Sequence, residues 1–178
     1  MSGKLVGIFL LICGAVAGAG LYYLQIYGFY EEVAATDGPD VQLVLLDSNV
    51  EQAIEYSNFR AVDADSSPIR FRACFETTET LDALSATYVD AGDVTPRNAP
   101  GWFDCFDAAA LAEELQAGTA RVFLGQKNVR YGVDRIVAVT VDGRGYIWHE
   151  LNDCGDKAYD GTVVGEECPP LPTTNGEG

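Results

Sequence analysis

An uninterrupted apolar segment near the N-terminus separates this chain from an ordinary soluble protein. Residues 5–24, LVGIFLLICGAVAGAGLYYL, contain no charged side chain. At about 1.5 Å of rise per residue, a helix of this length spans about 30 Å, the thickness of the hydrocarbon core of a bilayer. A single segment satisfies its backbone hydrogen bonds inside lipid only as a helix. We therefore expect one membrane-spanning helix, with its flanks, in residues 1–30.

The distribution of basic residues predicts the orientation of this helix. Lys4 lies at its N-terminal end, and the next basic residue in the chain is Arg60. Basic residues are retained on the cytoplasmic side of membranes. The N-terminus is therefore expected in the cytoplasm, with the rest of the chain in the periplasm of a bacterium, anchored once in the cytoplasmic membrane.

A cleaved signal peptide is the alternative interpretation of the same segment. Ala17-Gly18-Ala19 has the small-residue pattern of a cleavage site. The apolar run continues to Leu24, however, and a single lysine makes a short basic region before it. A retained anchor is favoured, and cleavage after Ala19 stays open.

The predicted anchor contains two residue patterns that are typical of helices in contact with other helices or with lipid headgroups. Gly14 and Gly18 form a G-x-x-x-G spacing, which lets two helices approach closely. Small residues surround both glycines, so general composition explains the spacing equally well. Tyr23, Tyr27 and Tyr30 lie at i, i+4 and i+7, on one stripe of a helix. Anchoring among lipid headgroups is the preferred role of the stripe, and docking of a partner's helix is the alternative.

A second aromatic group lies in a loop predicted from the glycines and prolines of residues 89–101. Trp102 and Phe103 follow Pro100 and Gly101 directly. Large aromatic side chains at such a place either cover the core or form a contact patch for a partner. The first role is slightly preferred.

The charge of the chain excludes nucleic acid as a partner. The sequence has 27 acidic and 11 basic residues, for a formal net charge of −16, whereas a phosphate backbone is held by clustered Lys and Arg. All the acidic residues lie at or beyond Glu31. The part of the chain outside the membrane is therefore expected to be soluble and to be repelled by anionic lipid headgroups.

Four cysteines follow the anchor, namely Cys74, Cys105, Cys154 and Cys168. An even number in an oxidising compartment predicts two disulfides. Four cysteines permit three pairings. Cys154–Cys168 is preferred because these two bracket a short Gly-containing loop, and this leaves Cys74–Cys105.

The residue pattern predicts an α+β domain with an antiparallel sheet in residues 31–168, followed by a disordered tail, residues 169–178. The strongest signal is a β-hairpin around Asp142-Gly143. In residues 69–75 apolar and basic side chains alternate, which places Arg70 and Arg72 on one solvated face. Binding of an anionic group is one role for these two arginines, and pairing with nearby acids is preferred in so acidic a domain. The expected strands are 41–46, 69–75, 121–124, 135–141 and 146–151, and the expected helices are 80–88 and 107–117.

No catalytic motif is present, and no enzyme activity or cofactor is expected. His149, the only histidine, lacks a recognisable nucleophile motif in the sequence and is interpreted as a packed, hydrogen-bonded structural residue. Asp153, Asp156 and Asp160 make an oxygen-rich loop and are weak calcium candidates. Solvated loop acids are far commoner than metal ligands, so no metal site is predicted.

Four segments of the chain carry a resemblance to a known family, namely YYLQ (22–25), DADSSPIR (63–70), APGWFDCFDAA (99–109) and YGVDR (131–135). Through them the chain resembles an uncharacterised family of small alphaproteobacterial single-pass membrane proteins of unknown function. Members of that family are sometimes labelled histidine kinases. This sequence departs from a kinase because it has neither a phosphoacceptor-histidine helix nor glycine boxes for a nucleotide. The resemblance therefore implies no activity and no site.

These observations lead to three hypotheses about function. The favoured one is a non-catalytic accessory or assembly protein of a larger membrane complex, with the lipid bilayer and an integral membrane protein as its partners. The alternative is a periplasmic sensor domain that binds a ligand or calcium through its acidic loops. The third, ranked last, is an enzyme built around His149 and nearby carboxylates.

Overall fold

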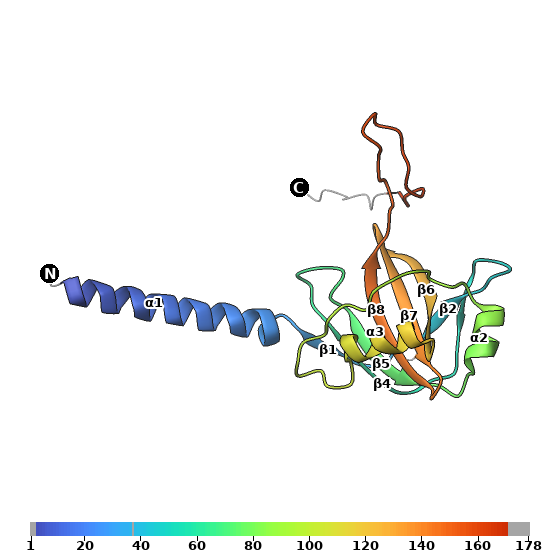
Figure 1. Cartoon of the computed structure of the whole chain (residues 1–178), viewed down its shortest axis with the longest axis horizontal. Helices are drawn as coiled ribbons and strands as arrows, with labels where there is room; N and C mark the ends of the chain where they lie inside the picture. Colours follow the sequence, from blue (N-terminus) through green and yellow to red (C-terminus); the bar gives the residue numbers. More distant parts are fainter. Residues whose placement is uncertain (1–2, 37, 171–178) are drawn as a thin grey trace.

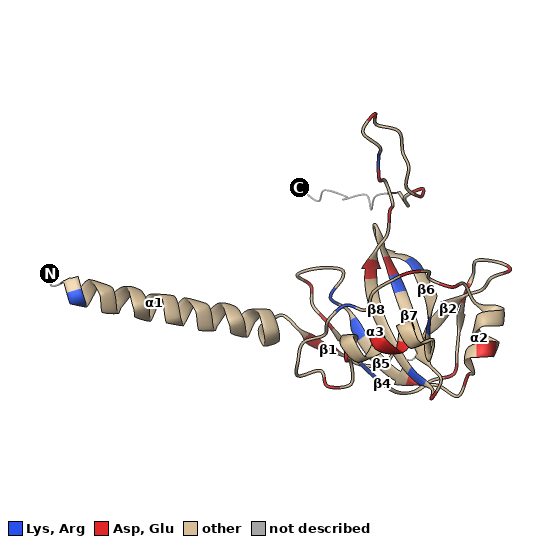
Figure 2. Ribbon diagram, viewed as in Figure 1, with Lys and Arg blue, Asp and Glu red and all other residues tan. Residues whose placement is uncertain are grey.

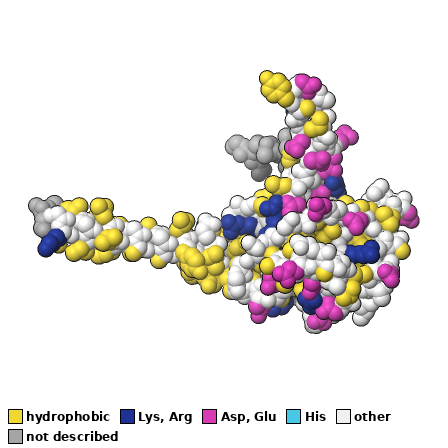
Figure 3. Space-filling model, viewed as in Figure 1, with side chains coloured by type: hydrophobic (Ala, Val, Ile, Leu, Met, Phe, Trp, Pro, Cys, Tyr) yellow, Lys and Arg dark blue, Asp and Glu magenta, His cyan; other side chains and the backbone are white. Residues whose placement is uncertain are grey.

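The computed structural model describes residues 3–36 and 38–170. A helix, α1 (Gly3–Tyr23), continues into a π-helical turn, η1 (Leu24–Gly28), and extends away from a folded domain (Figure 1). No residue of α1 is buried, and hydrophobic side chains cover its length (Figure 3). By length and composition this helix can cross a membrane, although signal sequences meet the same criteria.

The domain is built on a six-stranded sheet in which every pair of neighbours is antiparallel. The strand order is β1-β4-β5-β8-β7-β6, and a separate small sheet pairs β2 with β3. Together with two short helices, this confirms the predicted α+β fold class. The strands are β1 (Glu31–Val33), β2 (Gln42–Val44), β3 (Glu51–Ala53), β4 (Ser57–Asp63), β5 (Arg72–Glu76), β6 (Ala120–Arg130), β7 (Val133–Thr140) and β8 (Arg144–Leu151).

The two helices of the domain lie within the ranges 80–88 and 107–117 that the sequence predicts. Thr80 caps α2 (Leu81–Thr87) and Asp107 caps α3 (Ala108–Ala117), each through a side-chain oxygen that accepts a backbone N–H of the first turn. Gly118 ends α3 with φ +74°, in the left-handed region that glycine adopts without a steric cost.

The β7–β8 hairpin is present as predicted, and β5 differs from its prediction. β5 begins at Arg72 rather than at residue 69, because residues 64–70 form two consecutive turns around Pro68. The four residues from Arg72 to Phe75 are all buried. The expectation of one solvated face in this strand is therefore wrong, since core residues cover both faces.

β6 is longer than the predicted strand 121–124. Its pairing with β7 continues to Arg130 through two register shifts, after Leu124 and after Gln126. The added residues are mostly polar, so the apolar pattern of the sequence does not reveal them.

The two faces of the sheet carry separate hydrophobic cores. In β8, Ile147 belongs to one core and Tyr146 and Trp148 to the other, as the alternation of a strand requires. The first core lies between the sheet and the segments containing β2 and α2, and the second lies under α3 and the loop that precedes it. Members of the first are Val41, Leu43, Phe71, Phe75, Leu84 and Val137, and members of the second are Val62, Phe103, Phe106, Leu111 and Ile136.

Two disulfides close the domain. Cys74 of β5 is bonded to Cys105 in the loop before α3, and Cys154 is bonded to Cys168 beyond the end of β8. This is the pairing that the sequence analysis prefers. The predicted tail lies outside the described residues from residue 171 onward.

Candidate functional site: the aromatic junction and the acidic hairpin

The site closest to the anchor is an aromatic junction between η1 and the domain. We define it by Tyr23, Tyr27, Tyr30, Trp102 and Phe103. The Trp102 indole Nε1 donates a hydrogen bond to the backbone carbonyl of Ile26, at 2.7 Å. The sequence places these two residues 76 positions apart, and their contact joins the loop before α3 to the end of the anchor.

Ring stacking extends this contact over the tyrosine stripe. Tyr23 stacks on Tyr27 with centroids 5.8 Å apart, and Tyr27 stacks on Trp102 at 6.5 Å. Tyr30 meets the Trp102 ring edge-on at 6.3 Å. The stripe thus packs in part against its own domain, an arrangement that the sequence analysis did not consider.

Phe103 connects the junction to the core. Its ring lies edge-on to Trp102, and its side chain is buried. Two residues later, the disulfide from Cys105 to Cys74 fixes the same loop to β5. The loop that holds the anchor is therefore itself held covalently to the central sheet.

Arg70 is a functional candidate that the sequence analysis assigned to another role. It was expected to pair with an acid on a strand. Instead, its Nη2 donates to the Gln25 side-chain oxygen at 3.2 Å, and its guanidinium carbon lies 5.5 Å from the centroid of the Tyr30 ring. Both neighbours belong to the end of the anchor, 45 and 40 positions earlier in the chain, so no local pattern reveals them.

Arg72 also lies in a different environment from the solvated face that the sequence predicts. It is buried, and its guanidinium donates to the backbone carbonyls of Arg97, Asn98, Ile69 and Phe71. Burial lowers the pKa of this guanidinium to about 10. The role of Arg72 is to satisfy carbonyl groups of two loops beside the sheet.

Gly14 and Gly18 lie on an exposed helix. A Cβ atom built on either of them would meet nothing within 4 Å. At Gly145 of β8, by contrast, a Cβ would lie 2.1 Å from the Phe75 ring. The described fold of the chain therefore requires the small size of Gly145 but does not require that of Gly14 or Gly18.

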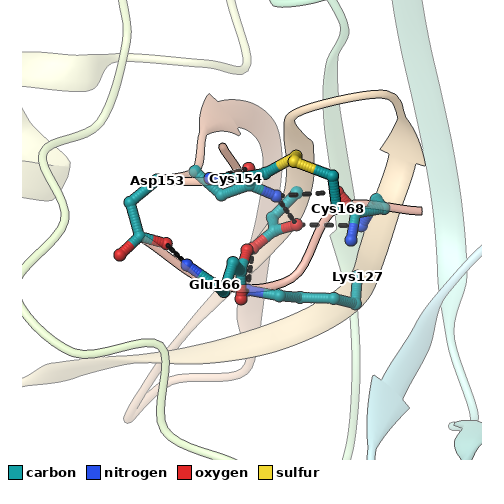
Figure 4. The surroundings of a disulfide bond; sticks show 8 residues. Lys127, Asp153, Cys154, Glu166 and Cys168 are labelled. Atoms are coloured by element: carbon teal, nitrogen blue, oxygen red, sulfur yellow. Dashed lines mark hydrogen bonds and ion pairs between the residues drawn. A yellow bond between two sulfur atoms is a disulfide. The ribbon is translucent and has the colours of Figure 1, made fainter. Parts of the chain in front are cut away.

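The second site is an acidic hairpin, residues 153–168, which extends from the end of β8 beyond the sheet (Figure 1). Cys154–Cys168 closes its base. Lys127 of β6 forms ion pairs with Glu166 at 2.6 Å and with Asp134 at 2.8 Å, and the Asp153 carboxylate accepts the backbone N–H of Glu166 (Figure 4). These contacts attach the base of the hairpin to the sheet.

The far part of the hairpin presents hydrophobic side chains to solvent. Lys157 and Val163 form a bridge across it, and Gly161 lies at its turn with φ +87°. Tyr159 is fully exposed, Val163 is 57% exposed and Val164 is 63% exposed. Hydrophobic side chains are visible at its far end, with acidic side chains beside them (Figure 3).

The weak calcium candidates lie in this hairpin and already have backbone partners. The Asp153 carboxylate accepts from Glu166, and the Asp160 carboxylate accepts from Thr162, a hydrogen bond that lowers the pKa of Asp160. Asp156 accepts through its backbone carbonyl from residues 164 and 165. Across the described ranges, no three His, Cys, Asp or Glu side chains form a group able to hold a metal ion. Calcium binding stays an untested alternative.

His149 is buried, with both ring nitrogens in hydrogen bonds. Nδ1 lies 2.8 Å from the Pro68 carbonyl oxygen and donates to it, and Nε2 accepts from Nε of Arg135 at 3.3 Å. The imidazole stacks on Phe71 with centroids 4.9 Å apart. Burial, reinforced by the nearby Arg135 and Arg72, lowers the pKa of His149 to about 4. At neutral pH the ring is uncharged and has no free lone pair with which to act as a base.

One comparison with known proteins gives a match. A family model described as "Family of unknown function (DUF6446)" matches residues 41–169. This range contains both disulfides, both cores and the acidic hairpin, and it leaves out the anchor. No curated protein and no solved structure matches the chain.

Proposed function

The chain belongs to DUF6446, a family of unknown function; since membership supplies no activity, we propose a function from the geometry. The protein is a non-catalytic accessory or assembly component of a larger complex in the cytoplasmic membrane of a bacterium. Its N-terminus is cytoplasmic, and its domain is periplasmic. The resemblance to alphaproteobacterial proteins supports this setting.

The membrane placement rests on three independent properties of the chain. α1 exposes an apolar surface that soluble proteins bury. Its one charged side chain, Lys4, lies at the end remote from the domain (Figure 2), as expected for a cytoplasmic N-terminus. The two disulfides support an oxidising compartment for the domain.

The observation that carries the accessory role is the short, fixed connection between anchor and domain. η1 ends at Gly28 and β1 begins at Glu31. Trp102 contacts η1 by a hydrogen bond to Ile26 and by stacking on Tyr27. A flexible linker would leave the angle between helix and domain variable. A component that contacts one partner both inside and outside the membrane needs a fixed angle between helix and domain, and this chain has such a connection.

Each part of the molecule then has a surface for that partner. Inside the membrane, Gly14 and Gly18 have open space where a second helix can approach. Outside it, the acidic hairpin presents Tyr159, Val163 and Val164 between five acidic residues and one lysine. The complementary partner surface is an apolar pocket with a basic rim, on the periplasmic part of the same membrane protein.

Native co-purification tests this proposal. We expect the wild-type chain, extracted in a mild detergent, to carry one stoichiometric membrane protein. Val163→Ser on the hairpin is expected to weaken its retention about tenfold, the equivalent of a moderate interface contact of about 1.4 kcal/mol. Val141→Ser is the matched control, because Val141 is another exposed valine, in the turn between β7 and β8.

Two outcomes would contradict the proposal. A wild-type protein that runs alone removes the accessory role. A partner that is retained equally by the Val163 and Val141 variants keeps the accessory role but removes the hairpin from the contact.

A further inference from the structure

We propose that Arg70 binds the phosphate of a phospholipid headgroup in the outer leaflet, beside the aromatic junction. This inference rests on the membrane placement in the proposed function, but not on any protein partner. The ligand is a net-neutral, zwitterionic phospholipid. Its binding holds the domain against the membrane surface.

The depth of Arg70 follows from the length of the anchor. The apolar run of residues 5–24 spans about 30 Å, so its last residue, Leu24, lies at the outer edge of the hydrocarbon core. The next residue, Gln25, accepts the hydrogen bond from Arg70. Ile26 accepts the hydrogen bond from Trp102. Both side chains of the domain are thereby placed at the level of the lipid headgroups.

The polar neighbours of Arg70 leave donors for a phosphate. A guanidinium has five N–H donors, and Gln25 accepts from one of its nitrogens. In the ranges 3–36 and 38–170, no Asp or Glu oxygen lies within 4 Å of an Arg70 nitrogen, although the chain has 27 acidic residues. The guanidinium fork matches a phosphate with two parallel hydrogen bonds. Among the residues that the structure describes, Arg70 thus has no carboxylate partner, and it lies at the proposed depth of the phosphates.

The aromatic rings around Arg70 also favour a position at the depth of the lipid headgroups. Its guanidinium lies over Tyr30, which in turn contacts Trp102. Tyrosine and tryptophan concentrate at the membrane interface because one end of each ring is apolar and the other polar. Other tyrosines of the stripe, including Tyr27, are exposed at the same end of the anchor. The junction therefore makes an interfacial belt that contains one cationic group.

The acidic residues nearby select the kind of headgroup. Glu31 and Glu32 follow Tyr30 directly and are exposed, and the domain as a whole is strongly acidic. A net-negative headgroup is repelled at this place. A headgroup with a phosphate and an ammonium satisfies both charges, with the phosphate on Arg70 and the ammonium near the glutamates. Phosphatidylethanolamine has this chemistry.

Solid-state NMR of the full chain in lipid nanodiscs tests the contact directly. The protein is labelled with ¹³C at the arginine Cζ, and dephasing by lipid ³¹P reports proximity. In discs of phosphatidylethanolamine and phosphatidylcholine, one arginine signal is expected to dephase. Arg70→Gln is expected to remove this dephasing. Arg121→Gln is the matched control, because Arg121 is an exposed arginine whose Nη1 donates only to Ser85 among the described residues.

The other arms separate the possible sources of phosphate. No dephasing in the wild type, or equal dephasing in the Arg70 variant, overturns the site. Dephasing by inorganic phosphate in phospholipid-free detergent overturns its assignment to a lipid. Stronger dephasing after replacement of phosphatidylethanolamine by phosphatidylglycerol overturns the zwitterionic selectivity.

The sample contains one purified protein, so failure of the proposed co-purification with a partner leaves this NMR result unaffected. A chain that lacks its anchor does not enter the discs, which identifies that failure before the NMR measurement.

Discussion

At the scale of single residues, His149 shows what the sequence predicts and what it leaves out. The sequence predicts a structural histidine, because it contains no nucleophile motif for a base to serve. Burial and two hydrogen bonds agree with that interpretation. Its partner Pro68 lies 81 positions earlier in the chain, and no local pattern encodes a contact over that distance. Arg70 was misassigned for the same reason, since its neighbours belong to the anchor.

The buried imidazole predicts a specific loss of stability in acid. The pKa of His149 is about 4 in the folded chain and 6.5 when unfolded. Between these values the unfolded chain binds the additional proton, so the free energy of unfolding falls as the pH falls. From pH 7.5 to pH 4.5 this single group is expected to cost about 2 kcal/mol.

The measurement is urea unfolding at the two pH values, for the wild type and for His149→Gln. Glutamine can still donate to the Pro68 carbonyl but does not titrate in this range. The carboxylates contribute equally to both proteins, so the difference isolates residue 149. A variant that loses as much free energy as the wild type would show that His149 is not held neutral.

At the scale of elements, predictions succeeded where the signal is local. The apolar spacing of helix 80–88, the residues Asp107 and Gly118 at the ends of α3, and the β7–β8 turn are each signals within or next to the element that they define. The length of β6 was missed because its last residues are polar and owe their conformation to pairing with β7. The aromatic junction was missed as a whole, although each of its residues was singled out, because a ring stack between residues 27 and 102 depends on the completed fold.

The two disulfides are expected to differ in what they stabilise. Cys74–Cys105 joins two parts of the second core across 31 positions, so its removal as Cys74→Ser with Cys105→Ser should cost about 3–4 kcal/mol. Cys154–Cys168 closes only the acidic hairpin. Its removal should leave the unfolding of the sheet unchanged and make the hairpin sensitive to proteases.

Trp148, which is fully buried, reports the unfolding of the sheet through near-UV circular dichroism. Limited proteolysis reports the state of the hairpin. Equal destabilisation of the sheet by both double variants would mean that the hairpin belongs to the same cooperative unit as the core.

At the scale of the whole molecule, composition and the apolar segment indicate a membrane anchor with a soluble acidic domain, and the structure has a matching shape. The helix bears one charged side chain, whereas acidic residues are spread over the domain and the hairpin (Figure 2). Retention of the helix is predicted from the length of the apolar run and its orientation from charge asymmetry, and the fold itself tests neither. These two properties therefore need their own measurement.

Intact-mass measurement combined with thiol alkylation tests the retention of the helix and the compartment of the domain. The protein extracted from membranes is expected to retain the segment before residue 20. It should take up one label before reduction, at the free Cys13, and five labels after reduction. Cleavage after Ala19 would instead give a shorter chain with no label before reduction and four after it. Five labels before reduction would place the domain in a reducing compartment.

The contact between Trp102 and Ile26 joins residues 76 positions apart, so it can form only after both have been synthesised. In the proposed membrane setting, the helix enters the bilayer before the loop that holds Trp102 is exported, and the disulfide Cys74–Cys105 then fixes that loop to β5. In that setting we expect the angle between helix and domain to become fixed only once the disulfide has formed. An assembly partner that contacts both parts would then bind the oxidised chain in preference to the reduced one.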